Sequence, residues 1–319
     1  MDRVRVIGAG VIGLTTAVCL AEAGVDVEVV SDRRPDATTS AAAGAMWDPY
    51  LVEPADQVDR WSRVTLSVLR ELSAETGSGV RLVEGTQQSR YPRELPSWTT
   101  VVGARPCLPG DLRRGYVTGW RYQAPLVDMP RFLDHLLRRL LRAGGHLRQH
   151  RYATINDSVD GAARVVVNCT GAGARSLVAD PLVDAVRGQL VVVENPGIES
   201  FFCDDTPGAP LTYVYPHGDT VVLGGTAEPG TWDLEPDQEA ARQILARCAA
   251  VEPLLAGARV IEHRVGLRPA RPRIRLETEP YGDTAVVHNY GHGGAGLTVS
   301  WGCAREAAEH VRRALGLTP

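Results

Sequence analysis

The sequence predicts an α/β protein with two kinds of sheet: a parallel sheet flanked by helices, and a second α+β part with a mainly antiparallel sheet. Two patterns carry this prediction. Over residues 4–33 a strand, a glycine-rich turn, a helix and a second strand follow one another, as in parallel α/β sheets. Residues 186–232 instead alternate short apolar runs with turn residues, which is typical of antiparallel strands. With 319 residues, the chain is long enough to bury both parts.

The composition excludes several classes of protein. The formal net charge is −4, whereas nucleic-acid-binding domains are usually basic. All 34 lysine-plus-arginine residues are arginine, so there is neither a Schiff-base lysine nor a Walker A lysine. The six cysteines form no C-x-x-C motif, which indicates a reducing compartment and no metal site. No apolar run reaches membrane-spanning length and a strand begins at once, so we expect a cytoplasmic chain without membrane or nucleic-acid partners.

The first unit, "VRVIGAGVIGLTTAVCLAEAGVDVEVVSDR", has the spacing of a dinucleotide-binding turn. Gly8, Gly10 and Gly13 permit a tight turn, close approach of the backbone to a pyrophosphate, and close packing of a helix expected over 11–23. Backbone N–H groups at the start of that helix would hold negative charge. Asp32 follows the second strand and is placed to accept hydrogen bonds from a ribose. A Rossmann unit that binds no nucleotide is the alternative.

The middle of the chain contains a second strong helix and a second buried strand. Residues 127–145 predict an amphipathic helix, capped by Asp128. The apolar strand that follows ends at Thr170-Gly171, which fits a return to the parallel sheet. The other elements expected are a helix near 58–77, loops from there to residue 124, a helix over 237–249 and a strand over 259–268.

The last unit repeats the strand, glycine and helix pattern. "AVVHNYGHGGAGLTVSWGCAREAAEHVRRAL", residues 285–315, leads a strand into a glycine-rich turn and a helix expected over 297–315. The turn is a second place where backbone and a positive helix end can approach a ligand. Two such junctions, at opposite ends of one chain, indicate one cofactor that spans both.

An unusually basic segment precedes this unit. Residues 265–277 read "VGLRPARPRIRLE", with four arginines between Arg268 and Arg275. The segment can be a solvated surface or a rigid mount for one buried guanidinium that binds an anion. The residues alone do not choose among the four arginines.

Taken together, "VIGAGVIGL", "NCTG", "LGGT", "GLRPARPRIRLE" and "HNYGHGGAGLT" resemble the D-amino acid oxidases over nearly the whole chain. The last two motifs are the most specific. The resemblance implies a glutathione-reductase-like, Rossmann-type domain with non-covalent FAD, and an α+β substrate domain. It implies hydride transfer from the Cα of a D-amino acid to flavin, release of ammonia and a 2-oxo acid, and formation of hydrogen peroxide from oxygen.

The resemblance also implies a division into two domains. The FAD-binding domain takes segments 1–50, 125–185 and 265–319, and the substrate domain takes segments 51–124 and 186–264.

The resemblance also assigns residues around the substrate. Arg268 matches the ligand of the substrate carboxylate, where a guanidinium binds in bidentate fashion. Tyr213 matches a second ligand of that carboxylate, and the carbonyl of Gly294 matches the acceptor for the amine. Tyr215 is expected to pack in the core. No catalytic side chain is expected, because hydride transfer depends on orientation; His292 is assigned to the structure of its turn.

The residues implied to bind the cofactor fall in five segments. Thr298 is matched to the flavin pyrimidine ring, and Tyr152 is a match of variable spacing. The full set is Gly8, Ala9, Gly10, Val11, Ile12, Gly13, Asp32, Arg33, Thr38, Thr39, Ser40, Gly44, Ala45, Met46, Tyr152, Thr170, Gly171, Gly293, Gly294, Gly296, Leu297 and Thr298. Cys303 is expected to pack within a helix rather than carry a covalent flavin.

The side-chain preference is predicted from missing cations. No arginine lies between Gly188 and Ala241, His217 is mostly neutral at pH 7, and Ala227 stands where D-aspartate oxidases tend to have arginine. An unpaired second carboxylate would be costly to bury, so neutral D-amino acids are expected, with a basic side chain as a weaker possibility suggested by Glu199, Asp204 and Asp205. The sequence does not place Arg105 and Arg121. Two other functions stay open: a D-aspartate or D-glutamate oxidase, and a non-catalytic flavin-binding protein. A homodimer also stays open. The family's mammalian members carry a tyrosine on an active-site lid, whereas the corresponding stretch here, "CDDTPGAPLT", 203–212, has none.

Overall fold

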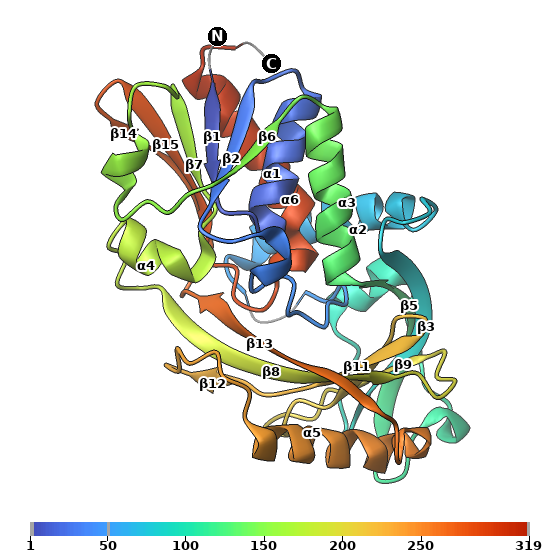
Figure 1. The fold of residues 1–319 in the computed structure, drawn as a ribbon. Coiled ribbons are helices and arrows are strands. Elements are labelled where there is room, and N and C mark those ends of the chain that lie inside the picture. The colour runs from blue at the N-terminus through green and yellow to red at the C-terminus, as the bar shows by residue number, and fades with distance from the viewer. Residues whose placement is uncertain (1–2, 50–51, 318–319) are drawn as a thin grey trace.

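The computed structural model describes residues 3–49 and 52–317. Within these residues the strands form one six-stranded sheet and one nine-stranded sheet. The six-stranded sheet and its helices lie on one side of the larger sheet, and α5 (Gln238–Val251) covers the other side (Figure 1). The predicted combination of a parallel sheet and a mainly antiparallel sheet is confirmed.

The six-stranded sheet is built around the first β-α-β unit. Strand β1 is buried at all four positions and pairs in parallel with β2 and β7, so its near-continuous apolar sequence matches burial on both faces. Only the β14–β15 pair at one edge is antiparallel. In sheet order the strands are β14 (Arg275–Tyr281), β15 (Thr284–Tyr290), β7 (Val165–Asn168), β1 (Val4–Ile7), β2 (Val27–Ser31) and β6 (His146–Gln149).

Helices α1 (Val11–Glu22), α3 (Met129–Arg142) and α6 (Gly296–Ala314) pack together on one face of this sheet, and α2 (Ala55–Leu72) contributes to the same core cluster (Figure 1). Helix α3 begins where the sequence predicts, because the Asp128 carboxylate accepts a hydrogen bond from the Arg131 backbone N–H at 3.4 Å. The helices are α1 (Val11–Glu22), α2 (Ala55–Leu72), α3 (Met129–Arg142), α4 (Ala174–Leu177), α5 and α6 (Gly296–Ala314). Among the helices of the described residues, none is long and apolar enough to cross a membrane.

The nine-stranded sheet is antiparallel except where β3 pairs with β9. Its order is β12 (Glu228–Pro229), β8 (Asp184–Glu194), β11 (Thr220–Gly224), β10 (Tyr213–Pro216), β9 (Phe201–Asp204), β3 (Val80–Ser89), β5 (Thr118–Val127) and β4 (Arg105–Pro106), with β13 (Val260–Ala270) also paired to β8.

The two faces of this sheet have different neighbours. Val214 of β10 packs in a cluster with Ile244 of α5. Tyr213 and Tyr215, on the opposite face, pack in a cluster that includes Met46 from the N-terminal segment. Because paired residues of neighbouring strands share a face, Cys203 lies on the same side as Tyr213. We call this side, which carries Tyr213, Tyr215, Cys203, Arg268 and Gly188, the site face.

Strands β3 and β5 correct the prediction of loops before residue 124. The end of β3 is polar yet buried, so it lacks the apolar alternation that identifies a strand. Its polar groups have distant partners: the Tyr122 hydroxyl donates to Gln87 Oε1 at 3.0 Å, and the Gln88 amide donates to the Asp111 carbonyl at 2.9 Å. Helix α2 also begins and ends earlier than predicted, at Ala55 and Leu72.

The predicted domain boundaries can be located on these elements. Those at 124/125, 185/186 and 264/265 fall within β5, β8 and β13, which all belong to the nine-stranded sheet. The boundary at 50/51 lies outside the described residues. The assignment of segments to domains stays a prediction.

Candidate active site

The two glycine-rich junctions meet in the structure. A Cβ added to Gly296, at the start of α6, would lie 3.9 Å from Val11 Cγ1 at the start of α1. Gly8 has a φ of 108°, and a Cβ there would lie 2.5 Å from the Cys169 carbonyl oxygen. Only glycine adopts this conformation and allows this approach between β1 and β7. The expectation that both junctions serve one site is consistent with their contact.

The ends of the two helices at this junction suit a negatively charged ligand. Neither α1 nor α6 has an acidic residue in its first turn or a side-chain cap, so their positive ends are not neutralised from within. Nearby, His292 is buried and its Nε2 has no hydrogen-bond partner in the described part of the chain. Burial lowers the pKa of His292 to about 3, so its ring is neutral and cannot serve as a base that gains a proton at neutral pH.

The loop after β2 joins the helix start to the larger sheet. Ser40 Oγ accepts a hydrogen bond from the Val11 N–H at 3.0 Å. Thr39 Oγ1 accepts one from the Leu267 N–H at 3.3 Å. The Thr38 hydroxyl donates to the Pro35 carbonyl at 2.7 Å, within the loop. The predicted pyrophosphate loop therefore runs between the start of α1 and the strand that carries Arg268.

The next predicted segment, 44–46, reaches the site face. Gly44 lies against the Tyr213 ring: a Cβ there would be 3.0 Å from Cε2 and 3.3 Å from the hydroxyl oxygen. Ala45 has a φ of 44°, and its carbonyl accepts the Val127 N–H at 2.9 Å. Met46 forms a bridge with Leu126. The segment is held to the end of β5 while its glycine makes room for Tyr213.

The predicted adenosine contacts lie at the end of β2. Asp32 and Arg33 are exposed and hydrogen-bonded to each other at 3.2 and 3.1 Å. Tyr152 lies near this end. The backbone N–H of His150 donates to the Ser31 carbonyl at 2.9 Å, and the rings of His150 and Tyr152 are in edge contact with centroids 4.8 Å apart. Its hydroxyl accepts a hydrogen bond from Arg148 at 3.0 Å.

The remaining predicted contacts gather around Pro269. Gly293 donates its N–H to the Pro269 carbonyl at 2.9 Å. A Cβ on Gly171 would lie 3.7 Å from Pro269 Cγ. Thr170 is fixed by Asn168, whose Oδ1 accepts from the Thr170 N–H and hydroxyl at 3.2 and 2.7 Å. The "NCTG" turn, the "GLRP" strand and the last glycine-rich turn are therefore neighbours, although they are far apart in sequence.

Arg268 is half-buried on the site face and lacks an anionic partner. Its Nη1 donates to the Thr226 carbonyl at 3.0 Å. Across residues 3–49 and 52–317 no ion pair joins this guanidinium. Its stem passes Gly294, where a Cβ would lie 3.7 Å from Arg268 Cδ. The carbonyl of Thr226 was not predicted from the sequence as a support for Arg268.

Tyr213 presents a hydroxyl group beside Arg268. Burial raises the pKa of Tyr213 to about 12, and the nearby positive charge of Arg268 opposes this rise. The ring lies over Gly224 and stacks on Tyr215, with centroids 4.5 Å apart and planes at 16°. No hydrogen bond to the Tyr213 hydroxyl is present within the described residues. Tyr215 is buried in the core, as predicted.

The other arginines of the basic segment have structural partners or are exposed, as expected. Arg271 pairs with Asp180 at 3.0 Å, and Arg275 pairs with Glu277 at 2.6 Å. Arg273 is exposed. Of the four, Arg268 alone combines partial burial with the lack of a carboxylate partner among the described residues.

Arg105 and Arg121 do not reach the site face. Both lie on the other face of the nine-stranded sheet, where they are paired across strands β4 and β5. Arg121 binds Asp111 at 2.7 Å and Glu84 at 3.1 Å. The cations that the sequence could not place are therefore excluded from the surroundings of Tyr213.

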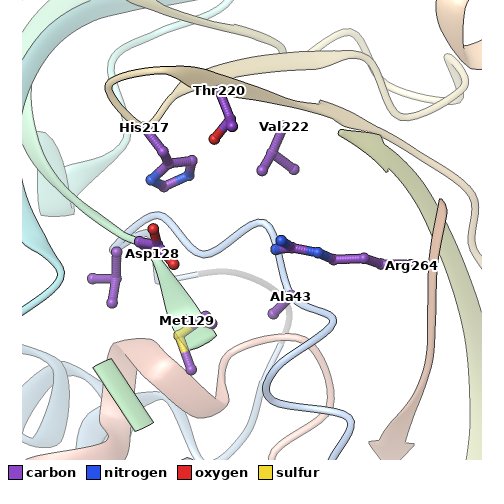
Figure 2. Close-up of a pocket in the computed structure, with 8 residues that line it drawn as sticks. Ala43, Asp128, Met129, His217, Thr220, Val222 and Arg264 are labelled. Atoms are coloured by element: carbon purple, nitrogen blue, oxygen red, sulfur yellow. The ribbon is translucent and has the colours of Figure 1, made fainter. Parts of the chain in front are cut away.

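His217 lines a small cavity next to segment 44–46. The cavity, shown in Figure 2, is about 20 Å³, enough for one water molecule. His217 Nε2 lies 3.4 Å from the Gly44 carbonyl, and burial lowers the pKa of His217. Arg264 and Asp128 face the same cavity. His217 is therefore not a cation for an acidic substrate.

Thr298 is already engaged by the protein. Its hydroxyl donates to the Asp48 carbonyl at 2.8 Å and accepts from the Asp48 N–H at 3.1 Å. Its backbone N–H, in the first turn of α6, makes no hydrogen bond among the described residues and is available to a ligand. Leu297 is buried in the core cluster. Cys303 is fully buried and its pKa lies well above the usual range because of burial, in agreement with a packing role.

These features define a class of protein: a Rossmann-type dinucleotide-binding enzyme with a substrate sheet against its cofactor site. The residues fit FAD in particular. The starts of α1 and α6 lie together without acidic side chains, and His292 beside them has no partner at Nε2 among the described residues. An exposed carboxylate follows β2. Residues 3–310 match the family described as FAD dependent oxidoreductase, and the chain belongs to that family.

Known proteins resemble the chain over nearly its whole length. It is 48% identical over 316 residues to D-amino-acid oxidase from Rubrobacter xylanophilus, covering 98% of this chain and 97% of that one. It is 40% identical over 328 residues to D-aspartate oxidase from Homo sapiens, covering 97% and 94%. The crystal structure of glycine oxidase from Geobacillus kaustophilus superposes with a TM-score of 0.81 at 20% identity, covering 98% and 95%, which supports the fold. The resemblance to D-amino acid oxidases and the assignment of FAD as cofactor are confirmed.

Proposed function

We propose that this FAD-dependent oxidoreductase is a D-amino acid oxidase. One observation carries the proposal: the half-buried guanidinium of Arg268 lies beside the hydroxyl of Tyr213. Among the described residues the guanidinium has no carboxylate partner and the hydroxyl has no hydrogen bond, and the Arg268 stem passes Gly294, just before α6. A carboxylate is the ligand that this pair of donors suits best. The near full-length relative named D-amino-acid oxidase supports the same conclusion.

The chain's own residues would act by binding and orientation. Arg268 and Tyr213 hold the substrate carboxylate, and the Gly294 carbonyl accepts a hydrogen bond from the amine. Held at two points, the substrate presents its Cα in one orientation. Buried His292 stays neutral, with a pKa of about 3, so no side-chain base is assigned. The imino acid that is formed takes up water and gives a 2-oxo acid and ammonia.

The cofactor would lie along the path of the glycine-rich junctions. Asp32 and Arg33 hold the adenosine end, while loop 38–40 and the first turn of α1 hold the pyrophosphate. Segment 44–46 and the backbone of Thr298 border the flavin ring. When bound, FAD accepts two electrons from the substrate and passes them to oxygen, which is reduced to hydrogen peroxide.

Neutral D-amino acids are preferred to acidic ones. A second carboxylate would need a second cation. His217 faces a separate cavity and is neutral, and Arg105 and Arg121 lie on the opposite face. D-aspartate oxidase is the alternative that the human relative keeps open.

A peroxide assay over a panel of D- and L-amino acids tests the function. We expect peroxide from D-alanine, D-valine and D-methionine, little from D-aspartate, and none from the L-enantiomers. A higher kcat/KM for D-aspartate than for D-alanine would assign the chain to the acidic-substrate oxidases. A flavin-loaded protein that gives no peroxide with any D-amino acid would support the non-catalytic alternative.

Three broader expectations accompany this function. The segments 1–50, 125–185 and 265–319 form the FAD-binding domain, and 51–124 with 186–264 form the substrate domain. All six cysteines are free thiols, which supports a reducing compartment such as the cytoplasm. A homodimer is kept as the first alternative to a monomer, to be resolved by light scattering.

A further inference from the structure

Asp48 is held at the border of the site face, although the sequence did not single it out. Its backbone is bound on both sides by the Thr298 hydroxyl, at 2.8 and 3.1 Å. It follows Met46 by two residues, and Met46 packs in the same cluster as Tyr215. Asp48 therefore lies between the start of α6, beside the proposed flavin position, and the Tyr215 cluster of the site face.

The carboxyl group of Asp48 has electrostatic neighbours on the site face. It interacts electrostatically with Tyr122, Tyr215, Cys203 and Asp205. Tyr122 donates to Gln87, and Cys203 is the strand partner of Tyr213. Tyr215, one of these neighbours, stacks on Tyr213, so Asp48 and the proposed carboxylate ligand share Tyr215 as a neighbour.

This carboxyl group has no compensating partner. Within residues 3–49 and 52–317, no hydrogen bond or ion pair reaches its oxygens. Asp205 differs, since Arg93 pairs with its carboxylate and also donates to its carbonyl at 2.8 Å. Burial, with the negative charge of Asp205, raises the pKa of Asp48 to about 7. A partly buried acid without a partner costs stability and is typical of a group that meets a ligand.

The balance of charge around this group favours a positive ligand. Arg268 is taken by the main carboxylate of the substrate in the proposed function. Arg93 is taken by Asp205, and Arg105 and Arg121 lie on the opposite face. Among the described residues, Asp48 is therefore the acid on this side that stays uncompensated once a substrate is bound.

We propose that Asp48 sets the side-chain specificity of the site, by accepting the ammonium or guanidinium group of a basic D-amino acid and excluding the second carboxylate of D-aspartate and D-glutamate. Substrates with apolar side chains carry neither group, so their kcat/KM should lie between the values for basic and acidic substrates. The proposal rests on the proposed function, since it takes Arg268 and Tyr213 to hold the main carboxylate.

The test compares substrates that differ only in the group facing Asp48. D-Lysine and D-norleucine share one carbon chain, with and without the terminal ammonium, and D-aspartate and D-asparagine differ in one charge. kcat/KM is measured for all four with flavin-loaded wild type and Asp48→Asn. We expect wild type to prefer D-lysine to D-norleucine. In Asp48→Asn the D-lysine to D-norleucine ratio should fall about tenfold or more, and the D-aspartate to D-asparagine ratio should rise.

Binding without turnover gives a second measurement. Oxaloacetate and pyruvate, 2-oxo acids with and without a second carboxylate, are titrated into each protein while flavin absorbance is followed. Oxaloacetate should bind Asp48→Asn more tightly than wild type, while pyruvate binding stays within about twofold of wild type. Glu84→Gln is the matched control: it removes one charge from the opposite, solvent-exposed face of the same sheet, and both ratios should match wild type.

The outcomes separate the two proposals. Wild type that oxidises D-norleucine but prefers it to D-lysine overturns the role of Asp48 and leaves the oxidase function intact. Equal ratios in wild type and Asp48→Asn do the same. If Asp48→Asn fails to fold or to load flavin, the wild-type ratio and Asp48→Ser decide. Wild type that oxidises none of the four substrates, nor D-alanine, overturns the proposed function itself.

Discussion

The guanidinium of Arg268 lies directly over the backbone of Gly188, on the neighbouring strand β8. A Cβ added to Gly188 would come within 3.0 Å of the guanidinium atoms, a separation that real Cβ atoms essentially never show. The strands pair closely here, with Gly266 opposite Gly188 and Arg268 opposite Val186. The glycine therefore leaves the space that the arginine occupies, and the position of the proposed carboxylate ligand depends on a residue that need not touch the substrate.

Substitution of Gly188→Ala should displace Arg268 without unfolding the chain, because the atoms in the way belong to the end of a flexible side chain. A misplacement of about 1 Å at a reacting site costs on the order of 100-fold in rate. We expect kcat/KM for D-alanine to fall by about that factor while flavin absorbance is retained. Gly110→Ala, at a glycine with open space around it, is the control and should be unchanged. Full activity of Gly188→Ala would show that the location of Arg268 is not critical.

Arg268→Ala should abolish most of the activity and keep the flavin. Truncation of a charge-assisted contact that leaves the partner carboxylate unpaired costs about 2–5 kcal/mol. We expect kcat/KM for D-alanine to fall by about 30-fold or more. Arg273→Ala, in the same segment but exposed, should retain wild-type kcat/KM. A near-normal kcat/KM in Arg268→Ala would place the carboxylate ligand elsewhere.

Asp48 should make stability depend on pH in a defined direction. Burial and the charge of Asp205 raise the pKa of Asp48 from 3.8 to about 7, so the fold favours its protonated form. The contribution of this group to stability is present below pH 3.8 and is lost as the pH rises through 7. Asp48→Asn lacks this loss, so its Tm relative to wild type should increase between pH 5 and pH 8. Thermal unfolding of both flavin-loaded proteins measures the difference, and a constant difference over this range contradicts the assignment.

The flavin should be released by acid precipitation. Cys303 is fully buried in α6 and packs with Trp61 and Val299, so its thiol is not placed as a point of attachment. We expect a yellow supernatant whose chromatographic mobility matches FAD, and an unchanged yield from Cys303→Ala. Colour that stays with the protein pellet would indicate a covalent bond, and a colourless protein would contradict flavin binding.

Local patterns predicted much of the fold and little of the support around the site. The first β-α-β unit, the cap at Asp128 and the last strand-to-helix junction all depend on residues adjacent in sequence, and each is confirmed. Strands β3 and β5 escaped prediction because the buried polar groups of Gln87 and Gln88 are satisfied by residues more than twenty positions away. An alternation of Trp120, Tyr122 and Ala124 with polar residues was the signal that could have identified β5.

The residues alone predict the class of cofactor, since the glycine spacing, the acid after the second strand and the helix starts are local features whose chemistry follows from backbone geometry. They also narrow the carboxylate ligand to four arginines. Contacts made in the folded chain distinguish them, because Arg271 and Arg275 pair with acids whereas Arg268 lies against Gly188 and the Thr226 carbonyl. The folded chain also shows the unusual environment of the Asp48 carboxyl group, which no local sequence pattern indicates. Electrostatic environment depends on which charges and apolar groups surround a residue in space, and the neighbours of Asp48 are supplied by strands 74 to 167 residues away.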